Sequence, residues 1–326
     1  MSYRTMTYKL LLFKNKSRFL LLVTVLISYS LICKVWAEQV NVSKYRITMQ
    51  IPLDNISTVD KSELGKLLFY DKKLSADRKV SCSSCHDPEH YFASSEKLSM
   101  GAFGLRTLRN TPSILNAGYY PILNMDGSAV GLETQIIYPL FGQREMAMSE
   151  SILLERLTKK PLYKEKFQNV FGVRSITLEN VVKSIASYER TLTSLNSAFD
   201  HYISGDKKAI SNAEKKGWKV FQQNCITCHS YSINQPFFSD FEFYNHRLET
   251  EKTNKDIGRY HYSHNAEDKE KFRTAPLRNV AHTAPYMHDG QFNSLAEVVN
   301  FYNTRIINTA LNEEEISDLL AFLHIL

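Results

Sequence analysis

The sequence contains few cysteines, almost no tryptophan and only one long hydrophobic run. Five of its 326 residues are cysteine and two are tryptophan, yet 43% are hydrophobic. A chain this apolar can bury enough surface to offset its ordering entropy, which excludes a disordered protein. The one long run, Phe19–Ile32, is shorter than the roughly 20 residues that a membrane helix needs. No second stretch is long enough to span a membrane, so the rest of the chain is expected to be soluble.

Acidic residues are missing from the first 37 positions, which hold six basic side chains. This segment accounts for the net charge of +6, because the remainder has 34 basic and 34 acidic residues. Without a basic surface to collect phosphates, no nucleic-acid partner is expected. Basic residues before Phe19–Ile32 and small residues ending at Ala37 are typical of a cleaved export signal over residues 1–37. An uncleaved anchor or a lipid on Cys33 are the alternatives.

The four remaining cysteines form two identical motifs. Each pair is Cys-x-x-Cys followed at once by histidine: Cys82 and Cys85 with His86, and Cys225 and Cys228 with His229. This spacing is typical of c-type haem, because two thiols on one helical turn reach one edge of the porphyrin and the histidine binds iron beneath it. Two disulfides, or one zinc site shared by both pairs, would need neither histidine. Two covalent haem c groups are therefore predicted.

Helical patterns dominate the rest of the chain, with little strand pattern. Helices are expected to begin near five capping residues, Asp60, Thr177, Ser211, Ser294 and Asn312. A long irregular stretch, residues 87–135, follows the first haem motif and is expected to wrap a cofactor. The order helix, motif, loop, helix occurs twice, 143 residues apart. An all-α fold is predicted, with two cytochrome c-like haem domains at residues 38–205 and 206–326.

Two haems in one exported chain permit three classes of function. A passive electron carrier needs six-coordinate iron at both haems, and a sensor needs an open iron and an output segment, which is not visible here. A peroxidase or oxidase needs one open iron beneath acid–base groups and a second haem that supplies electrons. The residues at the sixth coordination positions therefore decide the function.

Four further segments bear on that question: Gly65–Leu74, Leu108–Pro112, Pro139–Met146 and Ala275–Gly290. Together they resemble the bacterial di-haem cytochrome c peroxidases and their relative MauG, across essentially all of the mature sequence. The resemblance implies hydrogen peroxide as oxidant at the first haem. It also implies a calcium ion between the domains, bound by Asn110, Thr283 and Pro285 and by water.

The resemblance also assigns the pocket of the first haem. Ordinary peroxidases of this family place a histidine after the first motif, and it blocks the iron until the second haem is reduced. This chain has no histidine between His90 and His201, and His90 is too near His86 to reach the other side of the ring. An open first haem is expected. Gln135 and Glu145 fall on the family's pocket residues, and Glu145 is suited to moving a proton between the peroxide oxygens.

The sixth ligand of the second haem falls on Tyr302 in the same comparison, where ordinary peroxidases have methionine and MauG has tyrosine. Leu295, Val298, Val299 and Tyr302 also share one helical face, which favours an inward position. Met287 is a competing ligand. A phenolate oxygen stabilises oxidised iron, so the second haem is expected to store or relay oxidising equivalents.

Other residues near the haems are assigned less directly. Arg273, Arg278 and His288 are expected to support haem propionates. Met125 stands where the family has a tryptophan that carries charge between the haems, which puts fast charge sharing in doubt unless Tyr119 or Tyr120 substitutes. Five histidines match no ligand spacing and are expected to be surface or satisfied histidines: His201, His246, His261, His264 and His324.

The function favoured by these residues is a periplasmic, MauG-like enzyme that oxidises a partner protein with hydrogen peroxide. One alternative is an ordinary cytochrome c peroxidase that draws electrons from a small cytochrome or copper protein. The other is a non-enzymatic di-haem electron carrier. The partner would be a small cytochrome, a copper protein or a co-encoded target, and no membrane partner is expected after signal removal.

Overall fold

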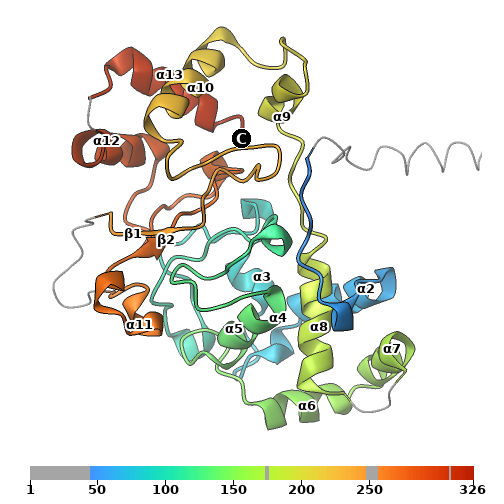
Figure 1. The fold of residues 1–326 in the computed structure, drawn as a ribbon. Helices are drawn as coiled ribbons and strands as arrows, with labels where there is room; N and C mark the ends of the chain where they lie inside the picture. Colours follow the sequence, from blue (N-terminus) through green and yellow to red (C-terminus); the bar gives the residue numbers. More distant parts are fainter. Residues whose placement is uncertain (1–44, 173–175, 247–255, 308–309) are drawn as a thin grey trace, which may run out of the picture. The chain divides into compact units, whose positions relative to one another are not determined.

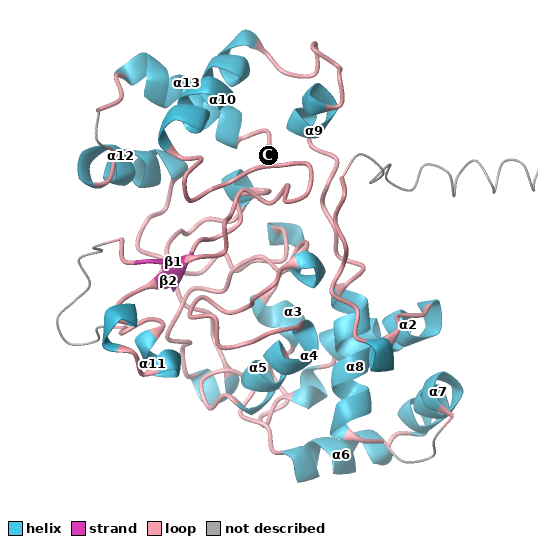
Figure 2. Cartoon of the chain, viewed as in Figure 1, coloured by secondary structure: helices cyan, strands magenta, loops and turns pink. Residues whose placement is uncertain are grey.

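A computed structural model describes residues 45–172, 176–246, 256–307 and 310–326. The export signal predicted over residues 1–37, with Cys33, lies outside the described residues. The described chain is mostly helix and loop, and its one sheet pairs β1 (Phe243–Tyr244) with β2 (Phe272–Arg273) in antiparallel register (Figures 1 and 2). No helix in these ranges has the length and apolarity that a membrane crossing requires. The predicted all-α class is confirmed.

Two crossing helices, α2 (Val59–Tyr70) and α8 (Leu178–Glu189), form the core beside the first haem motif (Figure 1). Leu64 and Leu68 of α2 and Ile185 of α8 are fully buried. Gly65 lies at the crossing, where an added Cβ would stand 1.9 Å from the carbonyl oxygen of Ser184. Only glycine lets the two backbones approach this closely.

A second crossing pair, α10 (Asn212–Asn224) and α13 (Glu313–Leu323), repeats this arrangement beside the second motif. Gly217 of α10 faces α13, and a Cβ there would again stand 1.9 Å from a carbonyl oxygen, that of Asp318. The core around this pair is aromatic and includes Phe199 of α9 (Ala198–Ile203) as well as Phe322. Leu295 and Val299 of α12 (Leu295–Arg305) complete it. The division into domains at residue 205 stays a prediction.

Four of the expected capping residues begin the expected helices. Thr177, Ser211, Ser294 and Asn312 are the N-caps of α8, α10, α12 and α13, and each side chain accepts a hydrogen bond from a backbone amide three residues on. The assignment of Asp60 as a cap was wrong. Thr58 caps α2 instead, because its extended backbone lets its hydroxyl accept from the Lys61 amide at 3.3 Å.

The stretch predicted to be irregular, residues 87–135, is mostly loop in the structure (Figure 2). Its regular parts are the short 3₁₀ helices η4 (Pro88–His90), η5 (Ala102–Gly104) and η6 (Ala117–Tyr119) and the single turn α4 (Leu132–Gln135). The other described α-helices are α3 (Cys82–Cys85), α5 (Ile137–Phe141), α6 (Glu150–Thr158), α7 (Pro161–Phe171) and α11 (Tyr260–Ser263). The remaining 3₁₀ turns are η2 (Leu53–Asn55), η3 (Lys72–Leu74), η7 (Ala266–Asp268) and η8 (Val280–His282).

Candidate active site

The first Cys-x-x-Cys-His motif has the local geometry that haem attachment needs. Cys82 and Cys85 begin and end the single helical turn α3, and His86 caps it. The Nδ1 atom of His86 lies 3.1 Å from the carbonyl oxygen of Phe92. Since a carbonyl can only accept, Nδ1 carries the hydrogen and Nε2 keeps its lone pair for a metal. Burial lowers the pKa of His86, which favours the neutral imidazole that binds iron.

The second motif is held in the same way. Cys225 caps α10, and Nδ1 of His229 lies 2.9 Å from the carbonyl oxygen of Phe238. Burial lowers the pKa of His229 as well. None of the four cysteines of the two motifs is paired in a disulfide. Both motifs therefore present two thiols and one oriented imidazole nitrogen, a donor set that fits a c-type haem.

Arg273 supplies a second observation that fits a bound haem. Its Nε atom donates to the carbonyl oxygen of Asn124 at 3.1 Å and its Nη1 atom to that of Thr274 at 3.2 Å. Burial lowers the pKa of Arg273 to about 10, and within the described ranges no carboxylate forms an ion pair with it. A buried cation without an anion is unfavourable, so this position suits an added carboxylate such as a haem propionate.

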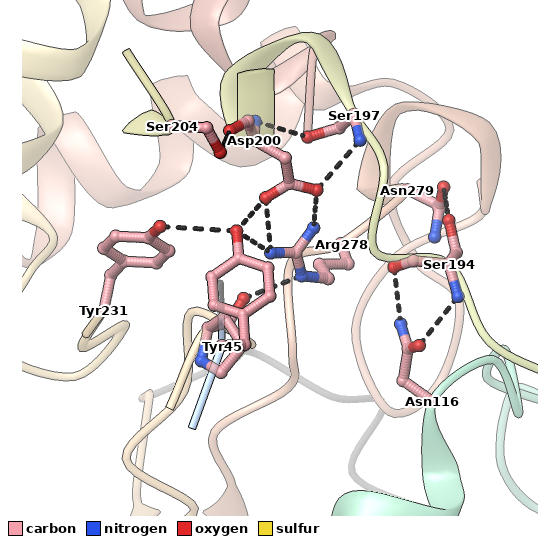
Figure 3. A network of polar contacts seen from close by, with 10 residues as sticks. Tyr45, Asn116, Ser194, Ser197, Asp200, Ser204, Tyr231, Arg278 and Asn279 are labelled. Carbon is pink, nitrogen blue, oxygen red and sulfur yellow. Dashed lines mark hydrogen bonds and ion pairs between the residues drawn. The ribbon is translucent and has the colours of Figure 1, made fainter. Parts of the chain in front are cut away.

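Arg278 has a different environment from the one expected. Its guanidinium donates to both carboxylate oxygens of Asp200, at 2.8 and 2.9 Å, to the Tyr45 hydroxyl and to the carbonyl oxygen of Pro236 (Figure 3). Burial alone would raise the pKa of Asp200, but Arg278 holds it below its usual range. Each side-chain nitrogen of Arg278 already has a partner. This ion pair holds Arg278 in place, and its role toward a propionate stays a prediction.

His288 and the expected calcium ligands are brought close together. His288 is buried, its ring stacks on Phe272 with centroids 4.0 Å apart, and burial lowers its pKa. Its carbonyl oxygen accepts from the Asn110 backbone amide at 2.8 Å, which places Asn110 beside the segment that holds Thr283 and Pro285. The Asn110 side-chain nitrogen donates to two carbonyl oxygens, so its oxygen points elsewhere. The calcium site and the propionate role of His288 stay predictions.

Glu145 lies beside the first attachment turn. Its amide donates to the carbonyl oxygen of Gly142 at 2.9 Å, and its own carbonyl oxygen accepts from Ala102 at 2.6 Å. Burial raises the pKa of its carboxyl group. The same carboxylate charge, after burial itself, contributes to the raised pKa of Cys85, so the two groups are neighbours. Gln135 does not hydrogen-bond to Glu145 among the described contacts, and its amide instead lies 3.4 Å from the Asn124 side-chain oxygen.

Tyr302 lies in the pocket of the second motif. Burial raises the pKa of its phenol, and charges on Cys228 and Cys225 add to the effect. Its hydroxyl is 3.4 Å from Nδ1 of His246. Burial, together with the charges of His229 and His288, lowers the pKa of His246 to about 4. His246 was expected to be a surface or satisfied histidine; its partner is Tyr302, 56 residues away, which no local spacing could reveal.

One further buried group escaped the sequence analysis. Glu189 ends α8, and its Oε2 atom is buried without a hydrogen-bond partner in the described structure. Burial raises its pKa to about 8. Its charge contributes to the raised pKa of Cys82, after burial itself. In the sequence, Glu189 comes after the apolar residues that mark the helix, and nothing there distinguishes it from an exposed glutamate.

Comparison with known proteins decides the family. Residues 59–208 match the di-haem cytochrome c peroxidase family. Cytochrome-c peroxidase IdrP1 of Pseudomonas sp. (strain SCT) is 35% identical over 281 residues, covering 78% of this chain and 74% of that protein. The chain belongs to the di-haem cytochrome c peroxidase family. Methylamine utilization protein MauG of Methylophilus methylotrophus is 33% identical, with 83% of this chain and 84% of that protein covered.

A solved structure extends the comparison to the fold. A MauG-like protein associated with microbial copper homeostasis superposes with a TM-score of 0.79 at 30% identity, covering 86% of this chain and 93% of that one. This di-haem peroxidase family member is therefore a haem enzyme, and its family uses peroxide as substrate. The relatives include both ordinary peroxidases and MauG proteins, so the family alone does not choose between them.

Proposed function

We propose that this enzyme uses hydrogen peroxide at an open first haem to oxidise a partner protein, as MauG-like enzymes do. The bound haems would supply the redox-active iron. Cys82, Cys85 and His86 would hold the first haem, and Cys225, Cys228 and His229 the second. The observation that supports the proposal is that Tyr302 belongs to α12, whose Leu295 and Val299 pack in the same core as Cys225 of the second motif.

Tyr302 favours storage of oxidising equivalents over electron entry. Its buried phenol lies within electrostatic range of Cys225 and Cys228, and the buried residues Leu295 and Val299 fix the same face of α12 against the core. A phenolate is a hard, anionic donor that favours oxidised iron, whereas methionine favours reduced iron and a high potential. A haem ligated by Tyr302 is therefore poorly suited to accept electrons from a small carrier protein.

Glu145 is proposed as the acid–base group at the first haem, with Gln135 as its polar neighbour in the pocket. The carboxylate of Glu145 can take a proton from one peroxide oxygen and return it to the other, which then leaves as water. The raised pKa of Glu145 suits both halves of this transfer, since it lies nearer to neutrality than that of an exposed glutamate. Cleavage of the O–O bond takes two electrons from the haem protein, and oxidation of the partner restores them.

The cellular setting is part of the same proposal. Residues 1–37 would direct export to the periplasm, where c-type haem and a partner protein would be available. Calcium on Asn110, Thr283 and Pro285 would bridge the two haem-bearing halves of the chain. One relative of similar fold is described as MauG-like and associated with microbial copper homeostasis, which supports a copper protein or a co-encoded protein as the partner.

The test is Tyr302→Phe in the enzyme loaded with both haems. The ring volume is nearly unchanged, so the fold should be kept while the sixth position of the second haem opens. Electron paramagnetic resonance should then record a changed low-spin signal, and the potential of that haem should rise. Tyr262→Phe, at an exposed tyrosine, is the matched control.

An unchanged signal and potential in Tyr302→Phe would contradict the proposal. Tyr302 would then be a packing residue, and Met287 would be the ligand to replace next. The enzyme would be an ordinary peroxidase that draws electrons from a small cytochrome or copper protein. Such a donor should reduce a methionine-ligated second haem readily and a tyrosine-ligated one poorly, so direct mixing with the donor separates the two functions.

A further inference from the structure

His246 and Tyr302 form a half-buried pair, and the imidazole of this pair has no role in the proposed function. We infer that His246 is a positioning residue for the second haem: its Nδ1–H donates a hydrogen bond to the Tyr302 oxygen and limits how strongly that oxygen binds iron. This inference rests on the proposed function, since it takes Tyr302 as the ligand.

The geometry of the pair supports a directed contact. Nδ1 of His246 lies 3.4 Å from the Tyr302 hydroxyl, and the two rings are nearly perpendicular, at 76°, with centroids 5.6 Å apart. Among the described residues, no other side chain hydrogen-bonds to this hydroxyl. The contact lies at the long end of the hydrogen-bond range. A small movement of the phenol toward a metal would therefore either shorten this hydrogen bond or break it.

Neighbouring elements hold His246 in place. It follows β1, whose Tyr244 pairs with Phe272 of β2, and Phe272 stacks on the buried ring of His288. Tyr302 is fixed from the other side, because Phe301 next to it packs on Phe292. Two separate parts of the chain therefore present an imidazole and a phenol to each other inside the second haem pocket.

The direction of the hydrogen bond follows from chemistry. A phenolate bound to iron has no hydrogen left, so the shared hydrogen must belong to the imidazole. Both neutral and protonated histidine can present a hydrogen on Nδ1. A donor to a ligating oxygen withdraws electron density from it, weakens its donation to oxidised iron and so raises the reduction potential of the haem. His246 would thus set how oxidising the second haem is.

Two substitutions separate the hydrogen bond from the bulk of the side chain. His246→Leu removes the donor, whereas His246→Asn keeps an N–H at nearly the position of Nδ1. In the enzyme loaded with both haems, His246→Leu should lower the potential of the second haem and shift its low-spin electron paramagnetic resonance signal. His246→Asn should recover most of both changes. His261→Leu, at an exposed histidine, is the control and should change neither.

The outcomes distinguish this inference from the function on which it rests. If His246→Leu leaves signal and potential unchanged while Tyr302→Phe alters them, the inference is overturned and the proposed function stands. If neither variant changes them, both are overturned. If His246→Leu removes the sixth ligand and Tyr302→Phe has no effect, His246 is itself the ligand, which also overturns the inference. A shift in His246→Leu with recovery in His246→Asn supports it.

Discussion

Two carboxyl groups lie near the first attachment turn, and burial raises the pKa of each. Glu145 is the neighbour of Cys85 and Glu189 that of Cys82. Their settings differ in one respect. Glu145 lies in a loop beside the proposed peroxide site, whereas Glu189 ends a helix in the core, and its Oε2 atom has no hydrogen-bond partner in the described structure. We therefore expect Glu145 to take part in proton transfer and Glu189 to make the stability of the protein depend on pH.

Replacing Glu145 with glutamine should leave both haems attached and slow peroxide cleavage by about 100-fold or more, the usual scale of general acid–base help. The amide has nearly the same shape but cannot exchange a proton. Rapid-mixing absorption spectra would give the rate. Glu150→Gln, at an exposed glutamate, should keep the original rate. An equal rate in Glu145→Gln would remove this residue from the mechanism.

Glu189 should make the free energy of unfolding depend on pH. Below about pH 4.3 both the folded and the unfolded chain hold its proton. Between there and its folded pKa of about 8, only the unfolded chain loses the proton, so stability falls as the pH rises. Glu189→Gln should remove that loss and stabilise the protein by roughly 2–4 kcal/mol more at pH 8 than at pH 5. Denaturant unfolding at the two pH values measures this.

The matched control for this titration is Glu165→Gln at an exposed site, which should leave the pH dependence of unfolding as it is. A Glu189→Gln variant whose stability falls with pH as steeply as that of the original protein would contradict the assignment.

At the level of single residues, the sequence predicted contacts that are local and missed contacts that are distant. The haem-attachment residues lie within five positions, so their chemistry can be inferred from spacing alone. His246 meets Tyr302 across 56 residues, and Arg278 meets Asp200 across 78. Such partners are set by the fold, so neither the pairing of Arg278 with Asp200 nor that of His246 with Tyr302 could be inferred from spacing.

At the scale of elements, each haem motif follows a helix with a glycine at its crossing point. Gly65 lets α2 approach α8, and Gly217 lets α10 approach α13. The repeat of helix, motif and helix was visible in the sequence, and so were most caps, because a cap depends on residues three positions apart. The paths of the loops between Asp87 and Gln135 could not be inferred from the sequence, because they are set by packing and by contacts with distant segments.

Gly217→Ala should destabilise the protein by about 2 kcal/mol or more. Alanine gains about 1 kcal/mol in helix propensity, but its Cβ would overlap the backbone of Asp318, which cannot move without separating α10 from α13. Thermal unfolding of the haem-loaded protein should show the lower midpoint. Lys219→Ala, at an exposed position on the same helix, should shift the midpoint little. A Gly217→Ala protein as stable as the original would show that the two helices can separate freely.

At the scale of the whole molecule, charged side chains connect the first half of the chain to the second. Arg109 donates to Asp126 at 2.7 Å and to Asp256 at 2.6 and 3.0 Å. Arg273 donates from its backbone amide to the carbonyl oxygen of Met125 at 2.7 Å. The segment with Met125, where the family has its relay tryptophan, is therefore bound directly to the second half. Aromatic rings flank this contact, since the Arg273 guanidinium lies over the ring of Phe241, which packs on Tyr120.

The same arrangement bears on activation of the enzyme. An ordinary peroxidase of this family stays inactive until its second haem is reduced, because a histidine covers the first. His90 is the nearest candidate after His86, and its Nε2 atom lies 2.9 Å from the carbonyl oxygen of Ala284, a contact with the second half of the chain. No other histidine precedes His201. The first haem should therefore be open in the fully oxidised enzyme.

It follows that the oxidised enzyme should react with hydrogen peroxide at once, without prior reduction. Rapid mixing of the oxidised, haem-loaded protein with peroxide should change the haem absorption in a single phase whose rate rises in proportion to peroxide concentration. His90→Ala should not speed that phase, because His90 is engaged by Ala284 and blocks nothing. A protein that stays inert until one electron is added, and that His90→Ala makes reactive, would show instead that His90 moves onto the first haem and that the enzyme belongs with the reductively activated peroxidases.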